Sequence, residues 1–198
     1  MTGTRSFEDA VTFHGHRCPG LALGYRAAGV GLEALGADAA GDEEIVAVVE
    51  NDACGVDGLQ VWAGCTFGKG NLRFLDYGKH VYTFYDRRTG RGVRVTVRPD
   101  FQTARFDPAF GALRDRVQSG AATPDERGEY DRRLRAVCDA ILAAPADGLF
   151  VVAPVEGPPP EPARIHRSVT CDACGEPVSE HRVVERDGQR LCIPCAGR

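Results

Sequence analysis

The stretch EIVAVVENDACGVDGLQVW, residues 44–62, sets the order of elements at the centre of the chain. Its first seven residues are mostly apolar and rich in valine and isoleucine, which predicts a buried strand over 44–50. Asn51 and Asp52 are good helix-capping residues, and we expect a helix over 55–62 to follow them. Cys54 is therefore expected where a strand gives way to a helix, a place where folds often build functional sites.

The segments on either side predict further helices and strands, and together they indicate an α+β domain. The predicted helices span 7–12, 19–35, 108–118 and 124–144, and the predicted strands span 80–86, 93–98 and 148–155. The helix over 19–35 carries Gly24, Gly29 and Gly31 beyond its first turn, each costing about 1 kcal/mol of helix propensity relative to alanine. We expect such a helix to pack closely against another backbone. Cys138 shares an apolar helical face with Ile141, which predicts a core position.

The segment GPPPEPA, 157–163, indicates a stiff, extended linker because four of its seven residues are proline. We therefore expect three parts: a main domain over 1–156, the linker over 157–163, and a small C-terminal module over 164–198.

Four cysteines of that module have the spacing C-x2-C, seventeen residues, C-x2-C, which is typical of structural zinc sites. We expect Cys171, Cys174, Cys192 and Cys195 to hold one zinc ion that supplies much of the folding free energy. Two disulfides are the alternative, and the absence of an apolar signal segment at the start of the chain argues against them.

Composition excludes several classes of function. The net charge is −4, and the apolar runs are far too short to cross a membrane. The C-terminal module has no Phe, Tyr or Trp to stack on bases, so we expect no nucleic-acid partner. We expect a soluble, cytoplasmic protein.

A second group of metal donors begins with His14, His16 and Cys18, which lie within five residues just before a predicted helix. Together with Cys54 they offer imidazole and thiolate groups, which favour Zn, Fe, Ni or Cu. We expect His16, Cys18 and Cys54 as ligands, with His14 either a fourth ligand or a partner behind them. Buried structural cysteines and histidines that only satisfy a turn are the alternative.

Cys65 is a less direct candidate ligand. A straight helix between Cys54 and Cys65 would separate them by about 16 Å, too far for one ion. Three roles then remain for Cys65: it lies at the rim of the site, it belongs to the site of a second subunit, or it takes part in redox chemistry. Residues 69–98 hold eight Lys or Arg against two Asp, which indicates either a solvated hairpin or an anion-attracting rim.

Three segments of the chain resemble one known family: FHGHRCPGLALGYR (13–26), VENDACGVDGLQ (49–60) and GCTFGKGNLRFLDYGKHVYTFY (64–85). They closely resemble the FmdE family, which is named after a component of formylmethanofuran dehydrogenase, over roughly residues 7–155. The C-terminal module resembles the TraR/DksA-type zinc finger.

The resemblance implies an α+β domain related in topology to the catalytic domain of glyceraldehyde-3-phosphate dehydrogenase, with a mixed or antiparallel sheet, and usually a homodimer. It also implies a metal held by His16, Cys18 and Cys54. It further implies a cleft lined by residues of the third segment, of which the expected catalytic residues are Cys65, Lys69, Asp76 and Tyr77, with Lys79 beside them.

Three hypotheses of function follow. The first is a metal-dependent enzyme or redox protein, an oxidoreductase or a lyase, in which an open His/Cys site binds a small anionic substrate. The second is an accessory protein that handles a metal or an oxyanion such as molybdate or tungstate. The third is an assembly subunit whose zinc finger binds a protein partner.

Overall fold

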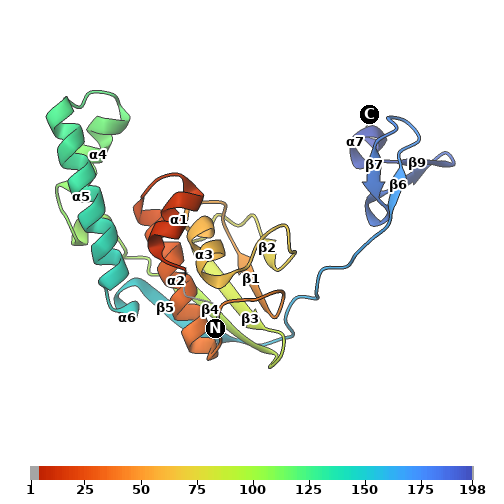
Figure 1. The fold of residues 1–198 in the computed structure, drawn as a ribbon, viewed down its shortest axis with the longest axis horizontal. Helices are drawn as coiled ribbons and strands as arrows, with labels where there is room; N and C mark the ends of the chain where they lie inside the picture. The colour runs from red at the N-terminus through yellow and green to blue at the C-terminus, as the bar shows by residue number, and fades with distance from the viewer. Residues whose placement is uncertain (1–4, 198) are drawn as a thin grey trace. The chain divides into compact units, whose positions relative to one another are not determined.

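The computed structural model describes residues 5–197 and divides the chain into two compact units (Figure 1). The first unit extends to Pro162 and the second begins at Ala163. Each unit has its own core, and they are described separately.

The first unit is built on a five-stranded sheet in the order β2-β1-β3-β4-β5. β1 pairs in parallel with the edge strand β2, and the other three pairings are antiparallel, so the sheet is mixed. This arrangement confirms the expected fold class. The strands are β1 (Ile45–Val49), β2 (Leu72–Phe74), β3 (Val81–Asp86), β4 (Arg91–Val97) and β5 (Phe150–Val155).

Three helices lie on one face of this sheet (Figure 1): α1 (Phe7–His14), α2 (Pro19–Leu35) and α3 (Gly55–Ala63). The glycine-rich helix α2 packs closely against α3, as expected. A Cβ atom on Gly24 would lie 1.8 Å from the carbonyl oxygen of Gly55. A Cβ atom on Gly58 would lie 2.4 Å from the carbonyl oxygen of Leu21. Glycine at these positions brings the start of α3, next to Cys54, against α2.

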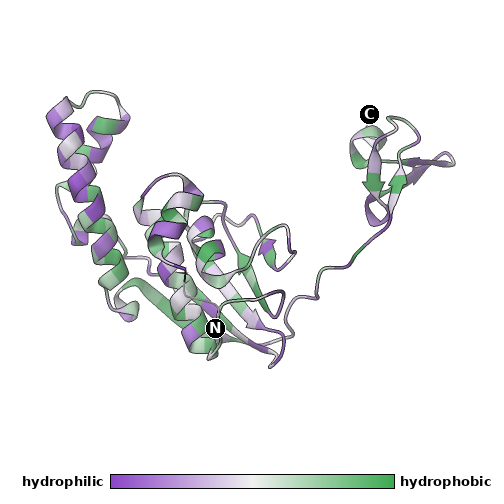
Figure 2. Ribbon diagram, viewed as in Figure 1, coloured by the Kyte–Doolittle hydropathy of each residue, from purple (hydrophilic) through white to green (hydrophobic). Residues whose placement is uncertain are grey.

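Between β4 and β5, helices α4 (Phe110–Gln118) and α5 (Pro124–Ala143) form a hairpin, preceded by a short 3-10 turn, Thr103–Arg105. The C-terminal half of α5 is anchored in the core through Val137, Cys138 and Ile141. The rest of the hairpin projects from the sheet, and α5 carries many hydrophilic side chains (Figure 2). A short helix, α6 (Ala146–Leu149), returns the chain to β5.

The proline-rich segment after β5 is hydrogen-bonded to the rest of the first unit as far as Glu161. Arg73 and Arg87 donate hydrogen bonds to the backbone carbonyl of Glu161, at 3.1 and 3.0 Å. Arg87 also donates to the carbonyl of Pro160 at 3.1 Å. These bonds hold part of the proline-rich segment against the side of the sheet where β2 lies.

The second unit contains two small hairpins and one helical turn. Its elements are β6 (Ser168–Thr170), β7 (Pro177–Ser179), the 3-10 turn Glu180–Arg182, β8 (Val184–Arg186), β9 (Gln189–Leu191) and α7 (Ile193–Ala196). Its buried cluster consists of Cys171, Leu191 and Cys192. Within residues 5–197, the helices are too short or too polar to cross a lipid bilayer.

Candidate metal centre

Two helix boundaries carry the first donors. The capping box of Ser6 and Asp9 starts α1, which ends at His14 because Gly15 turns the chain with φ of +90°. Cys18 is the N-cap of α2, and its sulfur accepts the backbone N–H of Leu21 at 3.3 Å. The intervening turn therefore places His14, His16 and Cys18 on one side of the chain.

Cys54 approaches the same point from the end of β1, next to the edge of the sheet. It follows β1 and immediately precedes α3. One donor atom from each of His14, His16, Cys18 and Cys54, here named the His/Cys cluster, lies within 4.8 Å of every other. Two imidazoles and two thiols at this spacing suit a transition ion such as zinc.

His14 is the most firmly held member of the His/Cys cluster. Its Nδ1 lies 2.7 Å from Oδ2 of Asp57, in the first turn of α3, and its Nε2 lies 3.9 Å from the Cys18 sulfur. Gln60 donates a hydrogen bond to the other oxygen of Asp57 at 3.1 Å. An imidazole that donates one N–H to a carboxylate presents its other nitrogen to a metal. Asp57 was missed from sequence, although its place three residues after Cys54 puts it on the first turn of α3.

The Cys18 thiol of the His/Cys cluster resists ionisation. Burial and, to a smaller extent, the neighbouring Cys54 thiol together raise its pKa to about 11, against the opposing effect of the Leu21 N–H. Two thiolates this close repel each other, and a divalent cation between them would reverse that repulsion. The donor set thus fits a bound cation.

His16 is the exposed member of the cluster and faces a cleft of about 710 Å³. The cleft extends from His16, Cys18 and Cys54 to the α4–α5 hairpin, where Arg114, Tyr130 and Arg135 line it. A second hollow of about 420 Å³ lies on the His14 side of Cys54 and is lined by Asn51, Asp57, Phe67 and Phe74, among others.

The expected catalytic residues do not gather at this cluster. The Cys65 thiol is fully buried in the core, and burial raises its pKa to about 12. Lys69 donates a hydrogen bond to the carbonyl of Asp42 at 2.8 Å. Asp76 and Tyr77 are exposed in the loop after β2 and line neither hollow. Lys79 lies over the Tyr77 ring, 5.8 Å from its centre.

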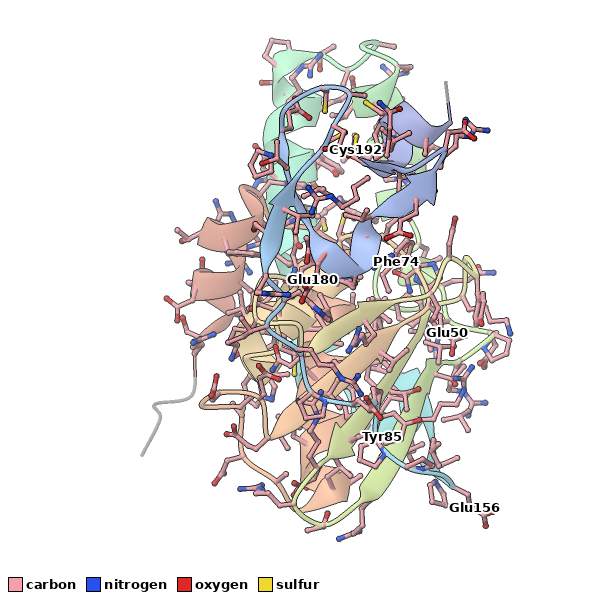
Figure 3. All side chains as sticks on the ribbon, turned by 90° about the vertical axis from the view of Figure 1, so that its right-hand side faces the viewer. Glu50, Phe74, Tyr85, Glu156, Glu180 and Cys192 are labelled. Carbon is pink, nitrogen blue, oxygen red and sulfur yellow. The ribbon has the colours of Figure 1, made fainter. Side chains whose placement is uncertain are left out.

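The basic residues over 69–98 are mostly paired within the chain. Arg94 forms two hydrogen bonds to the buried carboxylate of Glu50, which Figure 3 labels at the end of β1. Arg88 pairs with the buried Asp86 at 3.0 Å. Arg91 donates to the carbonyl of Leu35 at 3.2 Å. These contacts account for the charge as part of the sheet's structure, and they weaken the argument for an anion-attracting rim.

The second unit holds the other group of donors, Cys171, Cys174, Cys192 and Cys195, here named the four-cysteine cluster. Its four sulfur atoms also lie within 4.8 Å of one another, close to the labelled Cys192 in Figure 3. Backbone N–H groups of Cys174, Cys192 and Ala173 lower the pKa of Cys171 to about 6. None of the described cysteines is joined in a disulfide.

Comparison with known proteins agrees with both parts of the chain. Residues 165–198 match the prokaryotic dksA/traR C4-type zinc finger, so the C-terminal unit is a zinc finger of this type. A probable S-adenosyl-L-methionine-binding protein of Archaeoglobus fulgidus is 36% identical over 203 residues, a match that covers 98% of this chain. The chain spans only 53% of the length of that relative.

A solved structure has the same fold: a protein from Syntrophus aciditrophicus that is described as like FmdE of tungsten formylmethanofuran dehydrogenase. The TM-score is 0.62 at 24% identity, and the alignment covers 97% of this chain and 92% of the other. Residues 13–151 match the family model described as FmdE, molybdenum formylmethanofuran dehydrogenase operon. That match includes all four residues of the His/Cys cluster, and the chain belongs to the FmdE family.

Proposed function

We propose that this FmdE protein is a metal-dependent enzyme or redox protein whose reaction takes place at the His/Cys cluster. The observation that carries the proposal is the unequal support of the four donors. Three of them are held by the fold, while the fourth, His16, is exposed at the mouth of a large cleft. The zinc finger is then a separate structural site.

The three held donors are His14, Cys18 and Cys54. Asp57 fixes the ring of His14, whose side chain is only 11% exposed. The Leu21 N–H holds the sulfur of Cys18, and Cys54 is fixed between β1 and α3. Three protein ligands and one exchangeable position are the usual composition of a catalytic zinc site.

His16 completes the set from the solvent side. Its ring lies 4.4 Å from that of His14, and no hydrogen bond to another described residue fixes it. His16 is therefore the member of the set that would leave one position of a bound ion open to the cleft. A transition ion held here would supply Lewis acidity, or a redox couple if the ion were iron or copper. The chain's own part is to orient His14, to keep Nδ1 protonated through Asp57, and to shape the cleft.

Metal analysis of single-cysteine variants tests this proposal. The full chain should bind two ions, and Cys54→Ala should bind one, retained by the zinc finger. Cys65→Ala is the matched control: it also removes one thiol of the first unit, and we expect it to retain two ions. Two ions in Cys54→Ala, or one in a folded Cys65→Ala, would contradict the assignment.

A further inference from the structure

The 710 Å³ cleft beside the His/Cys cluster is rich in hydrogen-bond donors. Arg17, Arg114 and Arg135 line it with one carboxylate, that of Asp131. Arg17 is engaged elsewhere, because it pairs with Glu8 and Asp139 and lies over the Phe7 ring. The two remaining arginines of the cleft, Arg114 and Arg135, belong to the α4–α5 hairpin.

Arg135 is the least engaged of these cations. No hydrogen bond or ion pair joins its guanidinium to another residue of the described chain. The turn of α5 that carries it is nevertheless fixed, because the neighbouring Leu134 packs on the core and Val137 is buried in it. Arg114, across the hairpin, pairs with the adjacent Asp115 at 3.2 Å and with no other residue of 5–197.

Tyr130 adds a neutral donor to the same cleft. Its ring stacks on the buried Phe110, with centres 5.6 Å apart and planes 13° apart. Burial raises the pKa of its hydroxyl, so the group stays protonated at neutral pH, and the structure shows no hydrogen bond to it within residues 5–197. An aromatic floor below polar donors suits a small organic molecule better than a bare ion.

We propose that the cleft binds a small molecule that carries a carboxylate or phosphate group, held by Arg135 with Arg114 and Tyr130, while its other end reaches the His/Cys cluster. A guanidinium binds planar or tetrahedral oxyanions through two hydrogen bonds. The volume of about 710 Å³ is in the range of sites for such ligands. This inference rests on the proposed function, since it names the class of substrate for the same site.

Hydroxamate probes test it, because a hydroxamate binds an accessible metal ion while its tail is varied. The full chain is loaded with cobalt(II), and its visible absorption is titrated with acetohydroxamate, succinic monohydroxamate and phosphonoacetohydroxamate. The first has a neutral tail, the second a carboxylate and the third a phosphonate, so the arms distinguish the two anions. The Cys54→Ala spectrum supplies the contribution of the zinc finger.

We expect at least one anionic probe to bind with an affinity at least about tenfold higher than that of acetohydroxamate, as a charge-assisted hydrogen bond allows. Arg135→Gln should reduce this preference to about threefold or less and leave acetohydroxamate affinity unchanged. Arg132→Gln is the matched control: Arg132 is on the same helix, pairs with Glu129 and does not line the cleft.

Two results would overturn the inference in different ways. Equal affinities for all three probes, or a preference that survives Arg135→Gln, would exclude this anion site and leave the metal site standing. A cobalt spectrum identical to that of Cys54→Ala and insensitive to all three probes would exclude the proposed function and this inference with it.

Discussion

The His/Cys cluster and the four-cysteine cluster each bring four donor atoms within 4.8 Å of one another, but the chain supports them differently. The His/Cys cluster takes donors from two helix starts and a helix end on a five-stranded sheet. The four-cysteine cluster lies among two-stranded hairpins. Two of its cysteines, Cys171 and Cys192, themselves form most of the small buried core of that unit. In the first unit the packed core positions the donor residues, whereas in the second unit the folded structure depends on the metal that the cysteines bind.

This difference determines whether an ion bound at each cluster has a position open to a substrate. Four thiolates around one zinc leave no position for a substrate, so the four-cysteine cluster suits a structural role. The His/Cys cluster has an exposed histidine and an adjoining cleft, and its scaffold does not depend on the ion for its core. An ion that the fold does not need can exchange a ligand without unfolding the protein.

The largest expected difference between the two units follows removal of metal. A strong chelator at neutral pH should unfold the region from residue 163 onward, because structural zinc supplies most of the folding free energy of so small a unit. The first unit should keep its fold. Hydrogen exchange measured peptide by peptide would show loss of protection over 168–196 and retained protection in β1, β3 and β4. Equal loss of protection in both units would contradict the comparison.

The next effect in size tests whether packing alone holds the first unit. Gly24→Ala places a methyl group 1.8 Å from the Gly55 carbonyl oxygen, so α2 and α3 must separate. We expect a loss of about 3 kcal/mol in the free energy of unfolding, at the upper end of overpacking costs. Chemical denaturation of the chelated protein would measure it without a contribution from metal.

Gly128→Ala is the matched control for that substitution. Gly128 is also inside a helix, α5, but nothing lies within 4 Å of its added Cβ. Alanine there should stabilise the protein by about 0.5–1 kcal/mol through helix propensity. If both alanines had the same effect, the α2–α3 contact would not be the element that holds the site.

Local signals in the sequence predicted most elements of the first unit. The helices expected to begin at residues 7, 19 and 124 do begin there, and the structure shows why: Ser6 and Thr123 form capping boxes, and Pro19 is the first residue of α2. β2 was missed because Leu72–Phe74 is only three residues long and pairs in parallel with a strand distant in sequence. No periodic pattern can be recognised in so short a segment.

The site was predicted less completely than the fold. Donor types and helix ends pointed to His14, His16, Cys18 and Cys54 from sequence, and the structure brings them together. Arg135 and Tyr130 gave no such signal, because they line the cleft only through the way α5 packs on α2. Cys65 had the right chemistry for a site, but the fold buries it beneath Ile45, whose carbonyl lies 3.5 Å from its sulfur.

The smallest effect in this series concerns how the first unit orients a ligand. Asp57→Asn keeps the shape of the side chain but removes its charge and one of its two acceptor oxygens. The new amide must direct N–H groups either at His14 Nδ1 or at Gln60, so one of the two hydrogen bonds is lost. We expect metal affinity at the His/Cys cluster to fall about 10- to 100-fold, with zinc-finger affinity unchanged.

Competition with a chromophoric chelator would measure both affinities in one titration. Asp52→Asn is the control, because Asp52 lines the same hollow and the structure shows no hydrogen bond from its carboxylate to another described residue. If the loss comes from the orientation of His14, Asp52→Asn should lower the affinity by no more than about threefold. Equal losses in both variants would assign the effect to local negative charge. The orientation of His14 by Asp57 would then not contribute to metal binding, and this difference between the first unit and the zinc finger would disappear.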